Sequence, residues 1–261
     1  MNKAQFNSFD NFRNEFRSYC SDLNNKYAQE LIPIQKDAAK KDTPEYLVET
    51  PVVYNTALDE ITEKTEIHLI VIGDNPGKNE QLKKNQKYLV GQAGKIAAGF
   101  FEKNRELKTD FRKNVIILNK TPFHSAKTNH LKQILKNASP ELQNAIKESF
   151  VWMAKKTAEL HQNLCVLADK DAFVPELWLV GYAELKNKGI FTDYRDVLLN
   201  SYEGEWWKNV FVFQHFSMNR FTIDLKEFRK NNPQLSVIQS VHELGKIHKN
   251  EIFPKTLLHE R

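Results

Sequence analysis

The sequence predicts an α/β fold: a single three-layer domain in which a central, mostly parallel four-stranded sheet is flanked by helices. Short apolar runs with the composition of buried strands recur along the chain, and each ends in glycine or polar residues. The segments between them show the three-to-four-residue apolar spacing of helices. Strands that alternate with helices form a parallel sheet, because each crossover helix covers one face of it.

Composition limits the class of protein. At 261 residues, 41% of them hydrophobic, the chain suits one folded domain with a substantial core. The net charge of +5 permits nucleic-acid binding without requiring it. Cys20 and Cys165 lie far apart, so we expect two buried thiols and no disulfide framework or zinc site. We see no transmembrane run and no signal peptide, and therefore expect a cytoplasmic monomer without membrane contact.

Residues 1–60 are expected to form an N-terminal helix and a segment that wraps the core. Aromatic and apolar side chains at residues 6–23 recur every three or four positions, which is typical of one face of an amphipathic helix capped by Asn7 or Ser8. Residues 33–60 contain prolines and a stretch rich in lysine and aspartate, so we interpret them as connecting structure.

The remaining elements follow from apolar runs and capping signals. Ser139-Pro140-Glu141 predicts a helix start, because a serine caps, proline fits the first position and an acid suits the first turn. In chain order we expect a strand at 67–72, a helix at 94–107, a strand at 114–118, a helix at 139–163, strands at 176–180 and 210–213, and a helix at 233–248.

Polar loops follow the predicted strands, and the carboxyl ends of parallel strands meet at one edge of a sheet. After the first strand, residues 73–77 read Gly-Asp-Asn-Pro-Gly and place a carboxylate, Asp74, beside an amide, Asn75. Gly73 and Gly77 allow the backbone to approach a ligand closely. We expect this loop to form part of a binding site.

The other strand ends differ in their chemistry. Residues 119–125 and 215–220 are polar loops with amide, hydroxyl, imidazole and cationic groups, whereas Gly181-Tyr182 is interpreted as structural. At one edge these loops would suit a planar polar heterocycle attached to a phosphate-bearing chain, because an amide offers both a donor and an acceptor edge. A histidine can stabilise a developing oxyanion, and a carboxylate can orient water or face a sugar cation.

Other motifs are excluded by their spacing. Residues 73–78 are one residue short of a phosphate-binding P-loop, and Asn79 stands where serine or threonine should hold magnesium. Residues 242–248 lack the i, i+4 histidine spacing of zinc proteases, and His124 and His130 form no recognisable metal pair. No Gly-x-Ser-x-Gly elbow of a serine hydrolase occurs. We therefore expect no metal.

The motifs resemble those of the uracil-DNA glycosylase superfamily over residues 66–245. Residues 73–77 are similar to its first motif, of Gly-x-x-Pro-Gly type. Glu80 and the Val-Gly-Gln-Ala-Gly segment at 90–94 resemble the iron–sulfur branch of bacteria and archaea. His-Phe-Ser at 215–217 resembles the closing His-Pro-Ser motif. The resemblance implies a uracil-DNA glycosylase-like domain that extrudes a base from DNA and cleaves its glycosidic bond.

The resemblance also implies roles for single residues. Asp74 occupies the position of the acid that orients water and stabilises the sugar cation in the iron–sulfur branch. Asn75 stands in the place of the catalytic amide or acid of other branches, and His215 would stabilise charge on the departing base. Asn119 is similar to the asparagine that hydrogen-bonds the flipped base.

Further contacts to DNA are implied around these groups. Ser217 and the backbone of Gly77 would hold phosphates or the base edge. Arg220 would wedge the duplex or contact a phosphate. Lys83, Lys84 and Lys87 would line the track of the DNA backbone.

The chain also departs from the family pattern. The iron–sulfur branch needs four cysteines, so the two cysteines here exclude a cluster, and we expect no cofactor. Leu89 stands where that branch has an aromatic residue that stacks on uracil, a role for which Tyr88 or Phe123 would substitute. Phe216 replaces the proline of the closing motif.

Each functional interpretation has a structural alternative. Asp74 would cap the following turn, Asn119 would satisfy turn backbone, and His215 would be a hydrogen-bonded structural residue. Tyr88 and Phe123 would pack in the core, and the lysines would form a solvated face. The functional hypotheses are therefore three: a DNA glycosylase acting on uracil or a related damaged base, a non-catalytic nucleobase- or nucleic-acid-binding member of the same fold, and a hydrolase of small nucleotides.

Overall fold

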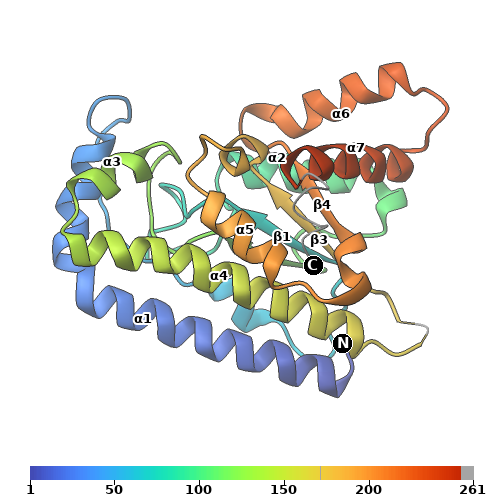
Figure 1. Ribbon diagram of the computed structural model, residues 1–261, viewed down its shortest axis with the longest axis horizontal. Helices are drawn as coiled ribbons and strands as arrows, with labels where there is room; N and C mark the ends of the chain where they lie inside the picture. Colours follow the sequence, from blue (N-terminus) through green and yellow to red (C-terminus); the bar gives the residue numbers. More distant parts are fainter. Residues whose placement is uncertain (171, 254–261) are drawn as a thin grey trace.

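The computed structural model, which describes residues 1–170 and 172–253, confirms an α/β fold with one four-stranded sheet (Figure 1). The strand order is β2-β1-β3-β4, and every neighbouring pair is parallel. All four predicted strands are confirmed, each within two residues of its expected ends. The strands are β1 (Leu69–Gly73), β2 (Val115–Asn119), β3 (Glu176–Val180) and β4 (Val210–Phe213).

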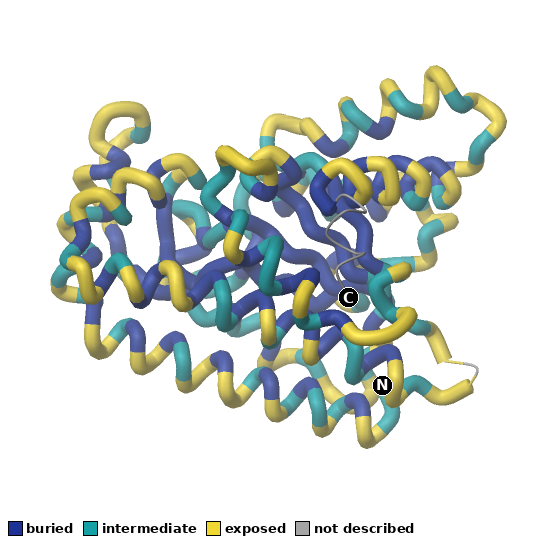
Figure 2. Tube along the Cα trace, viewed as in Figure 1, coloured by how far each residue is buried: buried dark blue, intermediate teal, exposed yellow. Residues whose placement is uncertain are grey.

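Helices cover both faces of the sheet, which explains why the strands are almost continuously apolar. In Figure 1, α4 (Pro140–Val166) and α5 (Thr192–Asn200) lie on one side of the sheet. On the other side lie α2 (Gln92–Lys103) and α7 (Val237–Ile252). The buried trace in Figure 2 is concentrated in the strands and in the helix faces turned toward them.

Capping residues set the starts of two long helices. Ser139 accepts the backbone N–H of Leu142 with its Oγ, at 3.3 Å, and Pro140 occupies the first turn of α4 as predicted. The predicted helix at 233–248 begins later, because Ser236 forms a capping box with Gln239. Local side-chain hydrogen bonds therefore decide these boundaries.

The N-terminal helix α1 (Lys3–Ala39) is much longer than the predicted helix at 6–23. Its cap is Asn2, whose side chain accepts the Gln5 N–H, so the predicted caps Asn7 and Ser8 are wrong. Those two residues lie inside the helix because the capping box at its true start supplies the orphan N–H groups with partners.

The interpretation of residues 33–60 as connecting structure is wrong up to residue 39, because α1 continues through Pro33. Tertiary contacts offset the hydrogen bond that this proline removes. Leu31 is fully buried, and the Gln35 amide donates to the carbonyls of Pro51 and His124, both at 2.9 Å. Further along the segment, Val48, Val52, Val53 and Leu58 are buried against the core.

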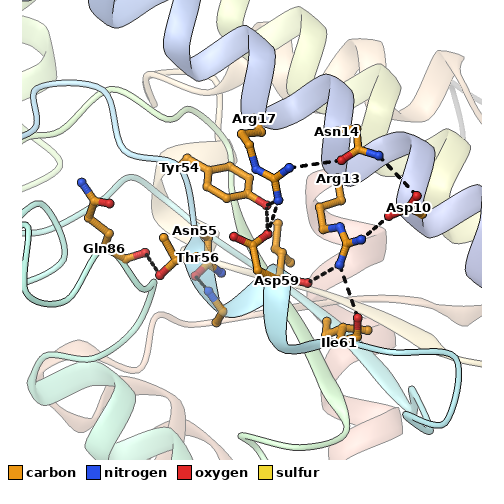
Figure 3. A network of polar contacts seen from close by, with 12 residues as sticks. Asp10, Arg13, Asn14, Arg17, Tyr54, Asn55, Thr56, Asp59, Ile61 and Gln86 are labelled. Atoms are coloured by element: carbon orange, nitrogen blue, oxygen red, sulfur yellow. Dashed lines mark hydrogen bonds and ion pairs between the residues drawn. The ribbon is translucent and has the colours of Figure 1, made fainter.

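Aromatic stacking holds α1 against α4. The Phe16 ring stacks on Trp152 at 6.0 Å between centroids and also packs on Tyr54 at 5.6 Å. Polar contacts then join α1 to the wrapping segment (Figure 3). Arg17 pairs with Asp59 at 2.5 Å, and the Tyr54 hydroxyl donates to the same carboxylate at 2.6 Å.

Short helices are the elements that the sequence pattern did not predict. α3 (His130–Asn137) and α6 (Arg220–Asn231) bury few residues, and such short segments carry too few periodic positions to stand out. α5 was missed for the same reason. The 3-10 helices are η1 (Thr56–Glu60), η2 (Arg105–Leu107), η3 (Tyr182–Leu185), η4 (Gly204–Asn209) and η5 (Ser217–Asn219).

Two further sequence expectations concern the cysteines and membranes. Cys20 and Cys165 are both free and buried, as predicted. Among residues 1–170 and 172–253, none of the helices combines the length and the apolar character needed to cross a bilayer.

The packing of α1 can be tested with Phe16→Ala. Phe16 is fully buried between α1 and α4, so its truncation should lower the free energy of unfolding by about 3–5 kcal/mol, measured by urea denaturation. Phe6→Ala, at a partly buried position of the same helix, is the control and should cost clearly less. Equal effects of the two variants would contradict this packing.

Candidate functional site

The carboxyl ends of the strands bring the predicted loops together. Register pairs Gly73 with Asn119, so the first and second loops leave the sheet side by side. A Cβ added to Gly73 would overlap Asn119 Oδ1, which shows how closely the two loops approach. His215 follows β4, and both Asp74 and Lys120 act electrostatically on it. Because all four strands are parallel, the acid and the histidine lie at the same edge of the sheet, and their sharing of one site stays a prediction.

Asp74 is buried and bound at both carboxylate oxygens. Lys120 Nζ donates to Oδ1 at 2.7 Å, and Thr128 Oγ1 donates to Oδ2 at 3.1 Å. Asp74 is 7% exposed and Lys120 is fully buried, so this is an internal ion pair. In the part of the chain that is described, no backbone N–H donates to the Asp74 side chain, which disfavours a role as a turn cap.

Lys120 is the main site residue that the sequence analysis missed. Lysine is among the residue types least often buried, so a lysine directly after a strand is expected to be exposed to solvent. The available signal was its position: it follows Asn119 directly and precedes an uncharged segment that is buried in the structure. Thr128, in the loop before α3, was missed because nothing in the sequence ties it to the first strand.

Gly181, interpreted as structural, lies directly against Asp74 and shapes the space around it. Its φ of 98° lies in the left-handed region, and a Cβ there would overlap the Asp74 carboxylate. Because glycine has no side chain, the end of β3 leaves the space that Asp74 occupies. Tyr182 is structural as expected, since its hydroxyl bonds to Glu251 on α7.

The Asn75 amide is oriented by Ser125. Its Nδ2 donates to Ser125 Oγ at 2.9 Å and to the Ser125 carbonyl at 3.0 Å. With the NH₂ group fixed in this way, Oδ1 has no partner within residues 1–170 and 172–253. Asn75 can therefore accept a hydrogen bond from a water molecule or a ligand.

The ring of His215 is held in one tautomer. Its Nδ1 accepts the Ser217 backbone N–H at 3.0 Å and lies 2.7 Å from Ser217 Oγ. A backbone N–H only donates, so Nδ1 carries no proton and the neutral ring bears it on Nε2. Burial lowers the pKa of His215; Asp74 raises it and Lys120 lowers it further. His215 is thus a neutral donor through Nε2.

Asn119 carries a buried donor without a partner. The residue is 2% exposed, and its Nδ2 has no hydrogen-bond partner in the described residues. An unsatisfied buried donor costs about 1–3 kcal/mol, so a site that leaves one open gains when a ligand supplies an acceptor. This arrangement disfavours the alternative in which the Asn119 side chain only satisfies turn backbone.

The predicted stacking role of Tyr88 and Phe123 is wrong. Both rings are buried in the core, at 1% and 0% exposure, as the alternative for these residues stated. The Tyr88 hydroxyl donates to the Val53 carbonyl at 2.5 Å, and Phe123 pairs through its backbone with Val52. Neither ring has a free face for a base.

The closing loop is anchored by Phe216, which replaces the proline of the family motif. Its ring is fully buried and packs on Phe221 at 5.0 Å. Met218, in contrast, is 70% exposed and has a φ of 52°. Arg220 is exposed at the start of α6.

Some predicted binding groups have partners within the protein. The Ser217 hydroxyl bonds to His215, and the Gly77 N–H donates to Glu80 Oε2 at 3.1 Å. Lys87 pairs with Glu60, whereas Lys83 and Lys84 are exposed. Phosphate contacts by these residues stay predictions.

No group of three or more histidine, cysteine, aspartate or glutamate side chains in residues 1–170 and 172–253 has the arrangement of a metal site. Comparison of the chain with protein-family models, with curated proteins and with solved structures finds no match.

The space occupied by Asp74 can be tested with Gly181→Ala. The new Cβ meets the carboxylate, and the positive φ adds strain, so the free energy of unfolding should fall by about 2–4 kcal/mol. Gly204→Ala is a matched control, because Gly204 also has a positive φ but nothing within 4 Å of its Cβ position. If both variants lose the same stability in urea denaturation, Gly181 does not constrain Asp74.

Glu80, beside the first loop, should make stability depend on pH. Burial raises its pKa to about 7, from a usual value of 4.5. The folded state therefore binds the proton more tightly than the unfolded state, and the free energy of unfolding falls as pH rises through this window. Glu80→Gln cannot ionise, so it should exceed the wild type in stability above pH 7 by up to about 3 kcal/mol.

Urea denaturation at pH 5 and pH 8 measures this effect. Glu205→Gln, at an exposed carboxylate, should retain the wild-type difference between the two pH values. The same difference in Glu80→Gln would show that Glu80 is not the responsible group.

Proposed function

We propose that this protein is a DNA glycosylase with a uracil-DNA glycosylase-like domain that hydrolyses the N-glycosidic bond of uracil or a related damaged base. The observation that supports the proposal is that Asp74, Asn75 and His215 all follow carboxyl ends of parallel strands, at one edge of the sheet. This reaction needs an anion, an amide oxygen that accepts a hydrogen bond from water, and a neutral imidazole that donates one. The proposed reaction uses no metal or cofactor.

Hydrolysis of a glycosidic bond passes through a sugar cation and a negatively charged departing base. Asp74 accepts hydrogen bonds from Lys120 and Thr128, which fix the orientation of its carboxylate near the sugar. Both of its oxygens already accept hydrogen bonds, which favours Asn75 Oδ1 as the group that orients water. His215 donates its Nε2–H to a carbonyl oxygen of the departing base.

Base selection in this proposal comes from Asn119. Its buried Nδ2 needs an acceptor, which an exocyclic oxygen of uracil or another oxo base supplies. A base with an amino group at that position would leave the donor unsatisfied.

The closing loop would contact the DNA duplex. Met218 is an exposed apolar side chain near His215, and apolar side chains of this kind separate base pairs in bent DNA. We therefore assign the wedge role to Met218 and a phosphate contact to Arg220, which starts α6 where helix N–H groups point outward. Extrusion of a base costs a few kcal/mol.

A second candidate is a non-catalytic module that binds a nucleobase or nucleic acid. The observation that favours it is the saturation of the Asp74 carboxylate by Lys120 and Thr128. Salt-dependent DNA binding without base release would identify this function.

Base release from oligonucleotides tests the proposal. The wild type should release base from uracil-, hypoxanthine- or mismatch-containing DNA, and His215→Ala and Asn75→Ala should each lower kcat by about 100-fold or more. Because the active form of His215 is neutral and its pKa is lowered, wild-type activity should fall only when the pH drops below 6.5.

His242→Ala is the matched control, since His242 pairs with Glu176 at the opposite end of the sheet and should leave activity unchanged. Absence of base release from all these substrates, with DNA binding retained, would favour the non-catalytic module instead.

A further inference from the structure

Lys120 lies beneath the site with no exposure to solvent. Its Nζ donates to Asp74 Oδ1 at 2.7 Å, to the Val180 carbonyl at 2.6 Å and to the Gly73 carbonyl at 3.3 Å. An ammonium has three N–H donors and no acceptor, so these three oxygens use all of them. These surroundings are those of a fixed cation and not of a nucleophilic amine.

The elements around Lys120 all contribute to this arrangement. Gly73 and Asp74 come from the end of β1, and Val180 from the end of β3. The Phe191 ring, next to α5, lies 5.2 Å from Nζ and presents its π face to the cation. A buried charge of either sign is costly without its partner, so Lys120 and Asp74 depend on one another.

We propose that Lys120 is the positioning residue of the site: its ammonium fixes the orientation of the Asp74 carboxylate and balances its charge beneath the substrate. His215 then experiences the opposed fields of a neutral pair instead of the field of a lone anion. The catalytic part of this inference rests on the proposed function, whereas its electrostatic part concerns the free protein.

Removal of either charge should shift the pKa of the His215 imidazole in a defined direction. Asp74 favours the protonated form of His215, and Lys120 opposes it. Without Lys120, the uncompensated carboxylate would promote an imidazolium, which replaces the neutral donor proposed for the departing base. The carboxylate would also lose its fixed orientation, and misplacement of a catalytic group by about 1 Å costs about 100-fold in rate.

The experiment follows the His215 imidazole by NMR titration in the full chain. In Lys120→Met the titration midpoint should move to higher pH, and in Asp74→Asn to lower pH. The neutral double variant Asp74→Asn/Lys120→Met should return it toward the wild-type value. Lys132→Met removes an exposed lysine that pairs with Glu184 and is the control, with no shift expected.

Activity provides the second measurement. Lys120→Met should lower kcat by about 100-fold with little change in KM, because it misplaces a catalytic group without touching the base. An unchanged His215 midpoint in folded Lys120→Met overturns the inference. Failure of the wild type to release any base defeats the proposed function but leaves the titration result standing.

If Lys120→Met does not fold, the exchange of the Lys120 Nζ protons with solvent in the wild type tests the proposed role of Lys120. Three buried hydrogen bonds should slow this exchange far below that of Lys132, and the Nζ signal should be that of an ammonium. Exchange as fast as that of an exposed lysine overturns the inference.

Discussion

The buried pair of Asp74 and Lys120 is the interaction on which the candidate site depends. Each ion would be strongly destabilising alone, so the loops after β1 and β2 have to meet with good geometry. The parallel register supplies that meeting by aligning Gly73 with Asn119. Gly181 completes the arrangement, since only glycine leaves room for the carboxylate and accepts the backbone conformation. The topology of the sheet therefore determines the geometry of this buried ion pair.

Most of the sheet could be predicted from the sequence because it follows from local signals. Apolar runs that end in glycine or polar residues mark the strands, and Ser139 marks the start of α4. The ends of α1 could not be predicted in this way. Pro33 normally breaks a helix, and the contacts that offset its cost come from Pro51 and His124, which are distant in sequence.

The residues of the site likewise fall into those that local sequence signals predict and those that depend on distant contacts. The loops that carry Asp74 and His215 were predictable, because strand ends converge whatever the side chains are. Lys120 and Gly181 were not, since their roles depend on contacts across three strands. The predicted stacking role of two aromatic residues failed for a related reason. Tyr88 and Phe123 lie beside the motifs in the sequence, but their side chains are buried in the core. The position of a residue next to a motif does not determine which way its side chain points.

The position of α1 has a consequence for biosynthesis. α1 is synthesised before α4, so the Phe16 side chain finds its partner Trp152 only after β1, β2 and the loops between them have been made. Until then the Phe16 ring can contact only Tyr54 of these two neighbours, and long-range contacts of the kind it makes with Trp152 form slowly. The interval between the synthesis of α1 and that of α4 is therefore the stage at which a chaperone has most to protect.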